Sequence, residues 1–346
     1  MQYRFFSFVL SLPLFIFSFC SLGFSVTSSP LEEIDTLSVK RIQNEIISKV
    51  IEINKNEFTL LLSPRPYWAL ERTLASLERS SGERKPVKIS GLPSGASPVI
   101  LDLGYSGIEG EILVADHGTH RFYAIDPKGQ IKWSKWVQAP AFSPRSIVGG
   151  ELGDIFVAGC LAIREYLDLG CKLIHHFGPK GKAYKASFFE TDTLAVKNQL
   201  FGLEQHFVDG NAKGQIVLLD SAIPKLQMRT GSNQGTKVYL IASDKIESIP
   251  LQRPTNGPPN AQRFWMMNGL ALLEDEVVIG YTSPFAAKHY IAVFSLNTGK
   301  QILKDQEVSG PIVGRSAIHS CFWISQQTRD VNQLHCMKLN KAKSKQ

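Results

Sequence analysis

ILVADHGTHRFYAIDPKGQIKW, residues 112–133, places a short apolar run, a polar turn, a second apolar run and a glycine turn in direct succession. Short apolar runs bounded by turn residues are typical of β-strands. Asp116 and Asp126 stand where the two runs end, and a carboxylate at that position can accept hydrogen bonds from turn N–H groups. The stretch therefore predicts two adjacent strands, with a third beginning after Gly129.

The same arrangement recurs along the chain. GEILVAD at 110–116 is matched by GDIFVAG at 153–159, a step of 43 residues from Gly110 to Gly153. We also match YAIDPKGQIKW at 123–133 with YLDLGCKLIHHF at 166–177, which equates Gly129 with Gly170. A period in the low forties with several strands per unit is typical of a β-propeller.

These motifs resemble the blades of NHL-type six-bladed propellers. In that family a glycine-led strand ends in Val-Ala-Asp, and His or Asn precedes Arg in the next loop, as His120 precedes Arg121 here. FGPKGKAY at 177–184 is similar to the glycine-rich link between such blades. The resemblance implies an all-β propeller of about six blades, which we place at residues 85–346.

The segment 26–84 has a different texture. Ser29-Pro30-Leu31-Glu32 has the form of a helix capping box. Apolar residues then follow at steps of three and four, which predicts one apolar helical face, and Pro66–Arg79 is a candidate second helix. These apolar residues are Leu31, Ile34, Val39, Ile42, Ile46, Val50 and Ile53.

Two alternatives remain open for this segment. Glu45–Ile53 and Glu57–Leu62 can instead form a hairpin around Asn54-Lys55-Asn56. Part of the segment can also supply an extra strand that closes the ring of blades. The polar stretch at 80–86 marks the boundary with the propeller domain.

Residues 1–25 have the pattern of an export signal. Arg4 supplies the charge, Phe5–Phe19 is almost wholly apolar, and Gly23 and Ser25 are small residues before a cleavage point. We expect a secreted or periplasmic protein with a cleaved signal peptide. The alternative is a protein anchored in the membrane by its N-terminus, and membrane contact is expected only through this segment.

The charge is spread thinly along the chain. The net charge is +7, and the densest lysines lie in the C-terminal tail. A nucleic-acid-binding arm has longer blocks of like charge, so we expect no nucleic acid partner. Nor does the sequence hold a nucleophile elbow, a phosphate-binding loop or a dinucleotide fingerprint.

Four residues are candidates for a ligand or metal site. His120, Arg121 and Trp265 are candidates for the face that binds a ligand. Asn268-Gly269-Leu270-Ala271 looks like an element of gluconolactonase-like calcium propellers. That resemblance implies Asn268 as a calcium ligand, because Ca²⁺ prefers oxygen donors. The acidic residue that usually follows in that family is absent here, so our main expectation is that no cofactor is bound.

The cysteines give a further prediction. HSCFWISQQTRDVNQLHCMKL at 319–339 reads as two strands around a polar turn, with Cys321 and Cys336 symmetric about it. Opposed positions in a hairpin are close enough for a bridge, so we expect a Cys321–Cys336 disulfide. For Cys160 and Cys171 we expect no bond, because we place a whole strand between them.

Two function classes follow from these patterns. The favoured one is an exported propeller that acts as a scaffold and binds a protein, peptide or glycan at the cell envelope, without enzymatic activity. The alternative is a calcium-dependent lactonase or hydrolase that uses the central channel. A third class is a purely structural sheet protein.

Overall fold

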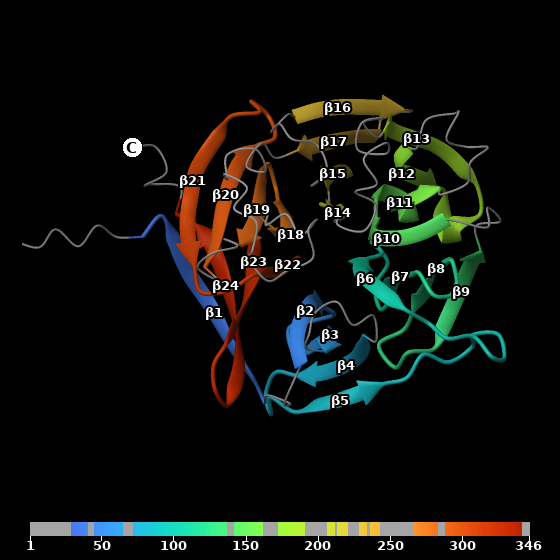
Figure 1. The fold of residues 1–346 in the computed structure, drawn as a ribbon, viewed down its shortest axis with the longest axis horizontal. Helices are drawn as coiled ribbons and strands as arrows, with labels where there is room; N and C mark the ends of the chain where they lie inside the picture. Colours follow the sequence, from blue (N-terminus) through green and yellow to red (C-terminus); the bar gives the residue numbers. More distant parts are fainter. Residues whose placement is uncertain are drawn as a thin grey trace, which may run out of the picture.

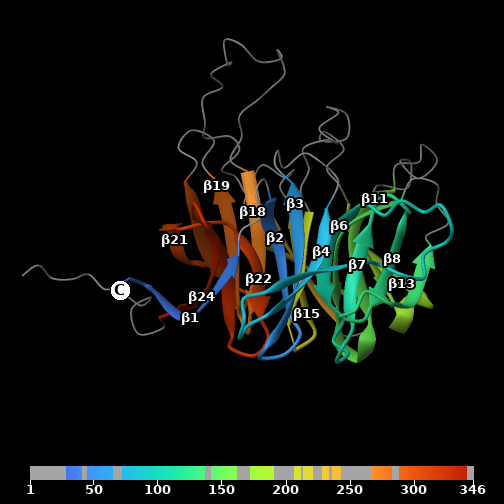
Figure 2. The same cartoon turned by 90° about the horizontal axis from the view of Figure 1, so that it is seen from below.

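The protein folds as a six-bladed β-propeller. The computed structural model describes residues 29–40, 45–64, 72–136, 142–161, 172–190, 206–211, 213–220, 228–233, 236–242, 266–282 and 288–340. The described strands form six four-stranded sheets. Figure 1 shows these sheets as blades around a central axis, with β2, β6, β10, β14, β18 and β22 nearest the axis. Figure 2 shows the same ring from the side.

In the first three blades the strands follow chain order from the axis outwards. Blade 1 contains β2 (Glu45–Glu52), β3 (Glu57–Pro64), β4 (Thr73–Glu78) and β5 (Arg84–Val87), and blade 2 contains β6 (Ile100–Tyr105), β7 (Ile112–Asp116), β8 (Arg121–Ile125) and β9 (Ile131–Trp136). Blade 3 contains β10 (Phe142–Gly149), β11 (Ile155–Leu161), β12 (Lys172–Phe177) and β13 (Tyr184–Glu190), with short 3-10 turns η1 (Glu151–Gly153) and η2 (Pro179–Gly181).

The second half of the ring is less regular. From the axis outwards, blade 4 contains β14 (His206–Gly210), β15 (Gln215–Asp220), β17 (Thr236–Ala242) and β16 (Met228–Asn233), and blade 5 contains β18 (Met266–Leu273), β19 (Glu276–Thr282), β20 (His289–Ser295) and β21 (Gln301–Val308). Blade 6 contains β22 (Ile312–Ser316), β23 (Cys321–Gln327), β24 (Val331–Leu339) and β1 (Leu31–Lys40). In blade 4 the chain passes to the outer edge first, so β15 pairs with β17 in parallel.

The stretch 112–133 forms the strands that its pattern predicts. β7, β8 and the start of β9 follow one another as antiparallel neighbours in blade 2. The Asp116 carboxylate accepts hydrogen bonds from the Val99 N–H at 2.8 Å and the Thr119 hydroxyl at 2.6 Å. Asp126 likewise accepts from two N–H groups of the turn that follows it. Both aspartates therefore cap turns.

The predicted match of Gly129 with Gly170 is wrong. In blade 3 the turn equivalent to that of Gly129 connects β12 to β13 and contains Gly181. FGPKGKAY at 177–184 is consequently a turn within a blade and does not link two blades. The turn between β20 and β21 in blade 5 is also equivalent to that of Gly129, and it contains Gly299.

The predicted N-terminal helical segment is also wrong. β1 pairs antiparallel with β24, from Leu31 opposite Leu339 to Lys40 opposite Val331. Within β1 the apolar residues do not share one buried face, because Val39 is fully buried whereas Ile34 is 39% exposed. The open alternative of a strand that closes the ring is confirmed, and Figure 1 shows β1 beside β24.

The alternative hairpin is confirmed as well. β2 and β3 pair around Asn54-Lys55-Asn56, and a bulge between Ile47 and Lys49 explains why the apolar spacing imitates a helix. The second predicted helix, Pro66–Arg79, is described from residue 72 onwards, and there the chain forms the strand β4 instead. Blade 1 therefore lies within 45–87, so the ring begins well before residue 85.

The core is divided among the spaces between neighbouring blades. One cluster contains Val39 and Trp323 from blade 6 together with Val50 and Phe58 from blade 1. The rings of Phe58 and Trp323 meet edge to face at 5.8 Å. Closing the ring with β1 therefore completes a buried interface. Within the described residues no helix is long and apolar enough to cross a membrane.

Candidate functional site

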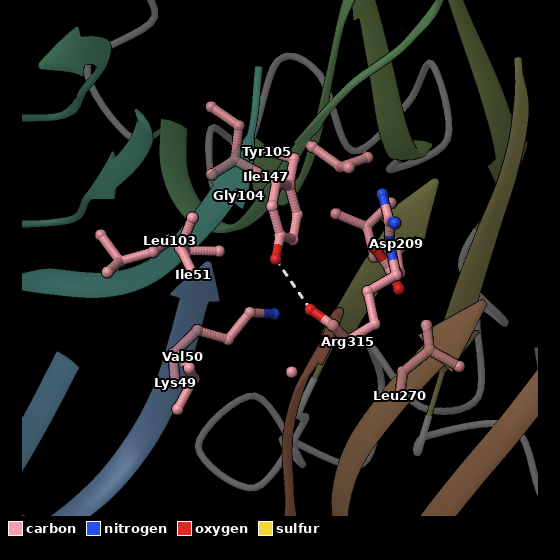
Figure 3. A pocket seen from close by; sticks show the side chains of 13 residues that line it. Lys49, Val50, Ile51, Leu103, Gly104, Tyr105, Ile147, Asp209, Leu270 and Arg315 are labelled. Atoms are coloured by element: carbon pink, nitrogen blue, oxygen red, sulfur yellow. Dashed lines mark hydrogen bonds and ion pairs between the residues drawn. The ribbon is translucent and has the colours of Figure 1, made fainter. Parts of the chain in front are cut away.

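A narrow cavity lies on the propeller axis, lined by residues from all six inner strands. Its volume is about 10 Å³, which is room for roughly one water molecule. In Figure 3 the side chains of Lys49, Tyr105, Asp209 and Arg315 reach this cavity from four different strands. The remaining lining is chiefly aliphatic.

Arg315 and Asp209 form an ion pair beside the cavity. The Arg315 Nε lies 3.1 Å from the Asp209 Oδ1, and the Asp209 Oδ2 accepts the Leu272 N–H at 2.9 Å. The Arg315 guanidinium lies over the Tyr105 ring, 4.7 Å from its centroid, and the Tyr105 hydroxyl donates to the Arg315 carbonyl at 2.7 Å. Burial by itself would lower the pKa of Arg315, but the carboxylate of Asp209 raises it above its usual value.

A second polar chain crosses the same region. The Lys49 Nζ lies 3.3 Å from the Asp102 Oδ1, and Asp102 also accepts the Ser146 hydroxyl and the Ile147 N–H. Ser146 in turn accepts the Val208 N–H at 3.0 Å. The Lys49–Asp102 pair thus joins blades 1 and 2, and hydrogen bonds through Ser146 continue the chain to blade 4. We interpret this arrangement as a set of links between inner strands, because buried charges need partners.

Asn268 lies on the inner strand β18, but its side chain extends over its own sheet. Its Nδ2 donates to the Thr282 hydroxyl at 2.5 Å, and the His289 Nδ1 lies 3.2 Å from the same nitrogen. The Asn268 Oδ1 is buried without a hydrogen-bond partner. Within the described residues no three His, Cys, Asp or Glu side chains gather as a metal site. Among the described residues, the side chains that contact Asn268 are thus the hydroxyl of Thr282 and the imidazole of His289.

The structure does not place His120 and Arg121 at the axis. His120 ends the turn between β7 and β8, and Arg121 begins β8 and donates to the Ser134 hydroxyl at 3.1 Å. This turn lies in blade 2, away from the residues that line the axial cavity. Trp265 lies outside the described residues.

The histidine pair in blade 3 is separated by the sheet. His175 and His176 occupy consecutive positions of β12, and both are buried. The His176 Nε2 lies 2.7 Å from an oxygen of Asp154, and its ring stacks on Phe156 at 4.3 Å between centroids. Burial lowers the pKa of His176, while Asp154 acts in the opposite direction.

Cys321 and Cys336 form a disulfide with their Cα atoms 5.6 Å apart. The register differs from the symmetric one, because Cys336 lies opposite Trp323. Cys321 lies two residues before Trp323 in β23 and on the same face of the sheet, so it is a diagonal neighbour of Cys336. Both cysteines are fully buried in the core between blades 6 and 1.

The expectation for Cys160 rests on a strand order that the structure does not have. β11 ends at Leu161, and its antiparallel partner β12 begins at Lys172. Cys160 therefore lies at the same edge of the blade as the start of β12, so a strand-length separation from Cys171 no longer applies. Cys171 itself lies outside the described residues.

Sequence reasoning missed the ionic residues at the axis, although the inner strands carry one usable signal. A glycine occurs in most of them, and a Cβ at Gly104 would lie 2.0 Å from the Ile147 carbonyl oxygen. A Cβ at Gly314 would lie 2.4 Å from the Val50 carbonyl oxygen. These glycines mark the crowded strands next to the axis, and Gly314 adjoins the charged residue Arg315.

Comparison with known proteins supports the architecture. No protein-family model matches the chain, and no curated protein matches it. A candidate exported protein of Bacteroides fragilis superposes with a TM-score of 0.54 at 13% identity, over 91% of this chain and 96% of that chain. The WD40 repeats of RRP9 superpose with a TM-score of 0.50 at 11% identity, over 89% and 100% of the two chains. At these identities the likeness concerns the β-propeller fold alone.

Proposed function

We propose that this protein is an exported NHL-like propeller that binds a protein, peptide or glycan at the cell envelope and catalyses no reaction. The observation that carries the proposal is the closed axis. Sites for small molecules usually have volumes of about 300–1,000 Å³, whereas the axial cavity has about 10 Å³. Binding then has to use the outer surface and the loops, where scaffold proteins commonly bind their partners.

The ionic groups at the axis support the same conclusion. Asp209 and Asp102 each bind a cation and backbone N–H groups. A catalytic base needs an oxygen that can reach a substrate, and a metal ligand needs an oxygen that can reach the ion. In this arrangement both carboxylates are already engaged in holding inner strands together.

Three observations support export. Residues 1–25 have the pattern of a signal peptide. The Cys321–Cys336 disulfide fits an oxidising compartment such as the periplasm or the cell exterior. The similar Bacteroides fragilis structure is that of a candidate exported protein.

The alternative, a calcium-dependent lactonase, rests on the unpartnered Asn268 Oδ1. One experiment separates the two functions. The purified protein is incubated with simple lactones, with calcium and with a chelator, and is applied in parallel to peptide and glycan arrays. We expect saturable binding to one array and lactone hydrolysis at background. Calcium-dependent hydrolysis, or an absence of saturable binding on both arrays, would overturn the scaffold.

The export part has its own test. N-terminal sequencing of the protein from the envelope or medium is expected to find a chain that starts near Val26. A cellular protein that still starts at Met1 and stays in the cytosolic fraction would contradict export.

A further inference from the structure

A groove of about 470 Å³ lies on the outer part of blade 1, where the chain passes from β5 to β6. One wall is formed by the start of β4 and the end of β5, including Leu74 and Val87. The other wall is the connection 88–99, which includes Ile89 and Leu92. Figure 1 shows this connection as the long cyan segment between β5 and blade 2. The volume is within the range of ligand pockets.

The connecting wall is held in place by blade 2. The Ser90 N–H donates to the Gly129 carbonyl at 3.0 Å, and the Ile131 N–H donates to the Ser90 carbonyl at 3.0 Å. The Ser90 hydroxyl also donates to the side chain of Gln130 at 2.9 Å. Because three hydrogen bonds fix this wall, the groove exists before any ligand arrives.

The groove is apolar along its length and positively charged at its edge. Ile89 and Leu92 are half-buried, and Pro93 and Pro98 are exposed. Arg72 and Lys88 supply two cations. In the part of the chain that the structure describes, neither forms an ion pair. Arg72 donates to the Leu101 carbonyl, and its Nε is buried without a hydrogen-bond partner.

We propose that this groove binds the carboxyl-terminal end of an apolar peptide segment. The terminal carboxylate would bind Arg72, with Lys88 adding long-range attraction, and apolar side chains would cover Leu74, Ile89 and Leu92. The Arg72 Nη1 already donates to the Leu101 carbonyl and its Nε is buried, so the carboxylate would accept a charge-assisted hydrogen bond from Nη2. This inference rests on the proposed scaffold function and names the site and the partner chemistry.

The openness of the groove favours a peptide over a fatty acid. Exposed residues such as Lys88, Gly91 and Pro93 form its rim, so one side of any occupant stays in water. A peptide can leave its polar backbone on that side. An acyl chain would leave apolar surface exposed there, which is unfavourable.

The test measures fluorescence anisotropy of a fluorescein-labelled apolar pentapeptide ending in Val-Leu-Val, as the free acid and as the amide. We expect the free acid to bind at least tenfold more tightly than the amide. Arg72→Met should lower the affinity for the free acid to that for the amide, and Lys88→Met should lower it to an intermediate value. Lys85→Met is the matched control, because Lys85 lies on β5 just before Lys88 and does not line the groove, and it should change nothing.

Ala96→Trp fills the groove without changing charge and should abolish binding of both peptides. Thermal melts of all variants confirm folding. Equal binding of acid and amide, or binding that survives Ala96→Trp, overturns the inference, as does tighter competition by dodecanoate than by the free peptide. If the arrays show a ligand that these variants do not affect, the scaffold function stands and the groove assignment fails.

Discussion

The Cys321–Cys336 disulfide is expected to contribute about 3 kcal/mol to the free energy of unfolding. The bond joins β23 to β24 across a sequence separation of 15 residues. Removing the cross-link from a loop of about 15 residues restores conformational entropy to the unfolded chain worth about 3 kcal/mol at 25 °C. Both sulfur atoms also lie in the core between blades 6 and 1. Replacing both cysteines with alanine should therefore cost roughly 1 kcal/mol more for the cavity.

The measurement is equilibrium unfolding in urea, followed by tryptophan fluorescence. Oxidised protein is compared with protein treated with a phosphine reductant and with the Cys321→Ala/Cys336→Ala variant. We expect the free energy of unfolding to be about 3 kcal/mol lower for the reduced protein than for the oxidised protein. It should be lower again for the variant. Because Trp323 lies in the same core cluster, its emission reports the interface directly.

The double variant is also the control. Treating it with reductant should leave its stability unchanged if Cys160 and Cys171 are free thiols. A fall in stability would reveal a second bond between them. If reductant leaves the wild-type protein unchanged although mass spectrometry shows the Cys321–Cys336 bond broken, the entropic account is refuted.

Three other predictions rely on similar measurements. Because burial lowers the folded-state pKa of His176 below 6.5, the unfolded chain takes up this proton first. The free energy of unfolding should then be highest above about pH 6.5 and should fall as the pH drops towards the folded-state pKa. Urea titrations at about pH 7.5 and 5.5 measure this fall, and His176→Gln should make it smaller. An unchanged pH dependence in the variant would contradict the assignment. Gly104→Ala should cost about 3 kcal/mol, because the new Cβ would lie 2.0 Å from a backbone oxygen, whereas Gly95→Ala, with no atom within 4 Å, should cost about 1 kcal/mol for its positive φ; equal losses would refute crowding at the axis. Calcium should raise the melting temperature of neither the wild type nor Asn268→Ala, and a rise confined to the wild type would favour the hydrolase.

Strands and turns whose signals are local could be predicted from the sequence. The apolar runs at 112–116 and 121–125, each ending in a turn with an aspartate acceptor, correspond to β7 and β8. The hairpin around Asn54-Lys55-Asn56 is another local signal, available as an alternative to the helix. Both depend on residues within a few positions of one another, so the chain itself carries the information.

The tertiary structure alone decided which strands became neighbours. β1 has the spacing of a helix in isolation and becomes a strand because β24, about 300 residues later, offers it a ladder of hydrogen bonds. The Arg315–Asp209 and Lys49–Asp102 pairs likewise join strands from different blades. Their charges do not stand out along the chain and become paired only when the inner strands converge on the axis. Closing a ring brings together residues that no local pattern relates, so its partners and its axial contacts exist only in the folded molecule.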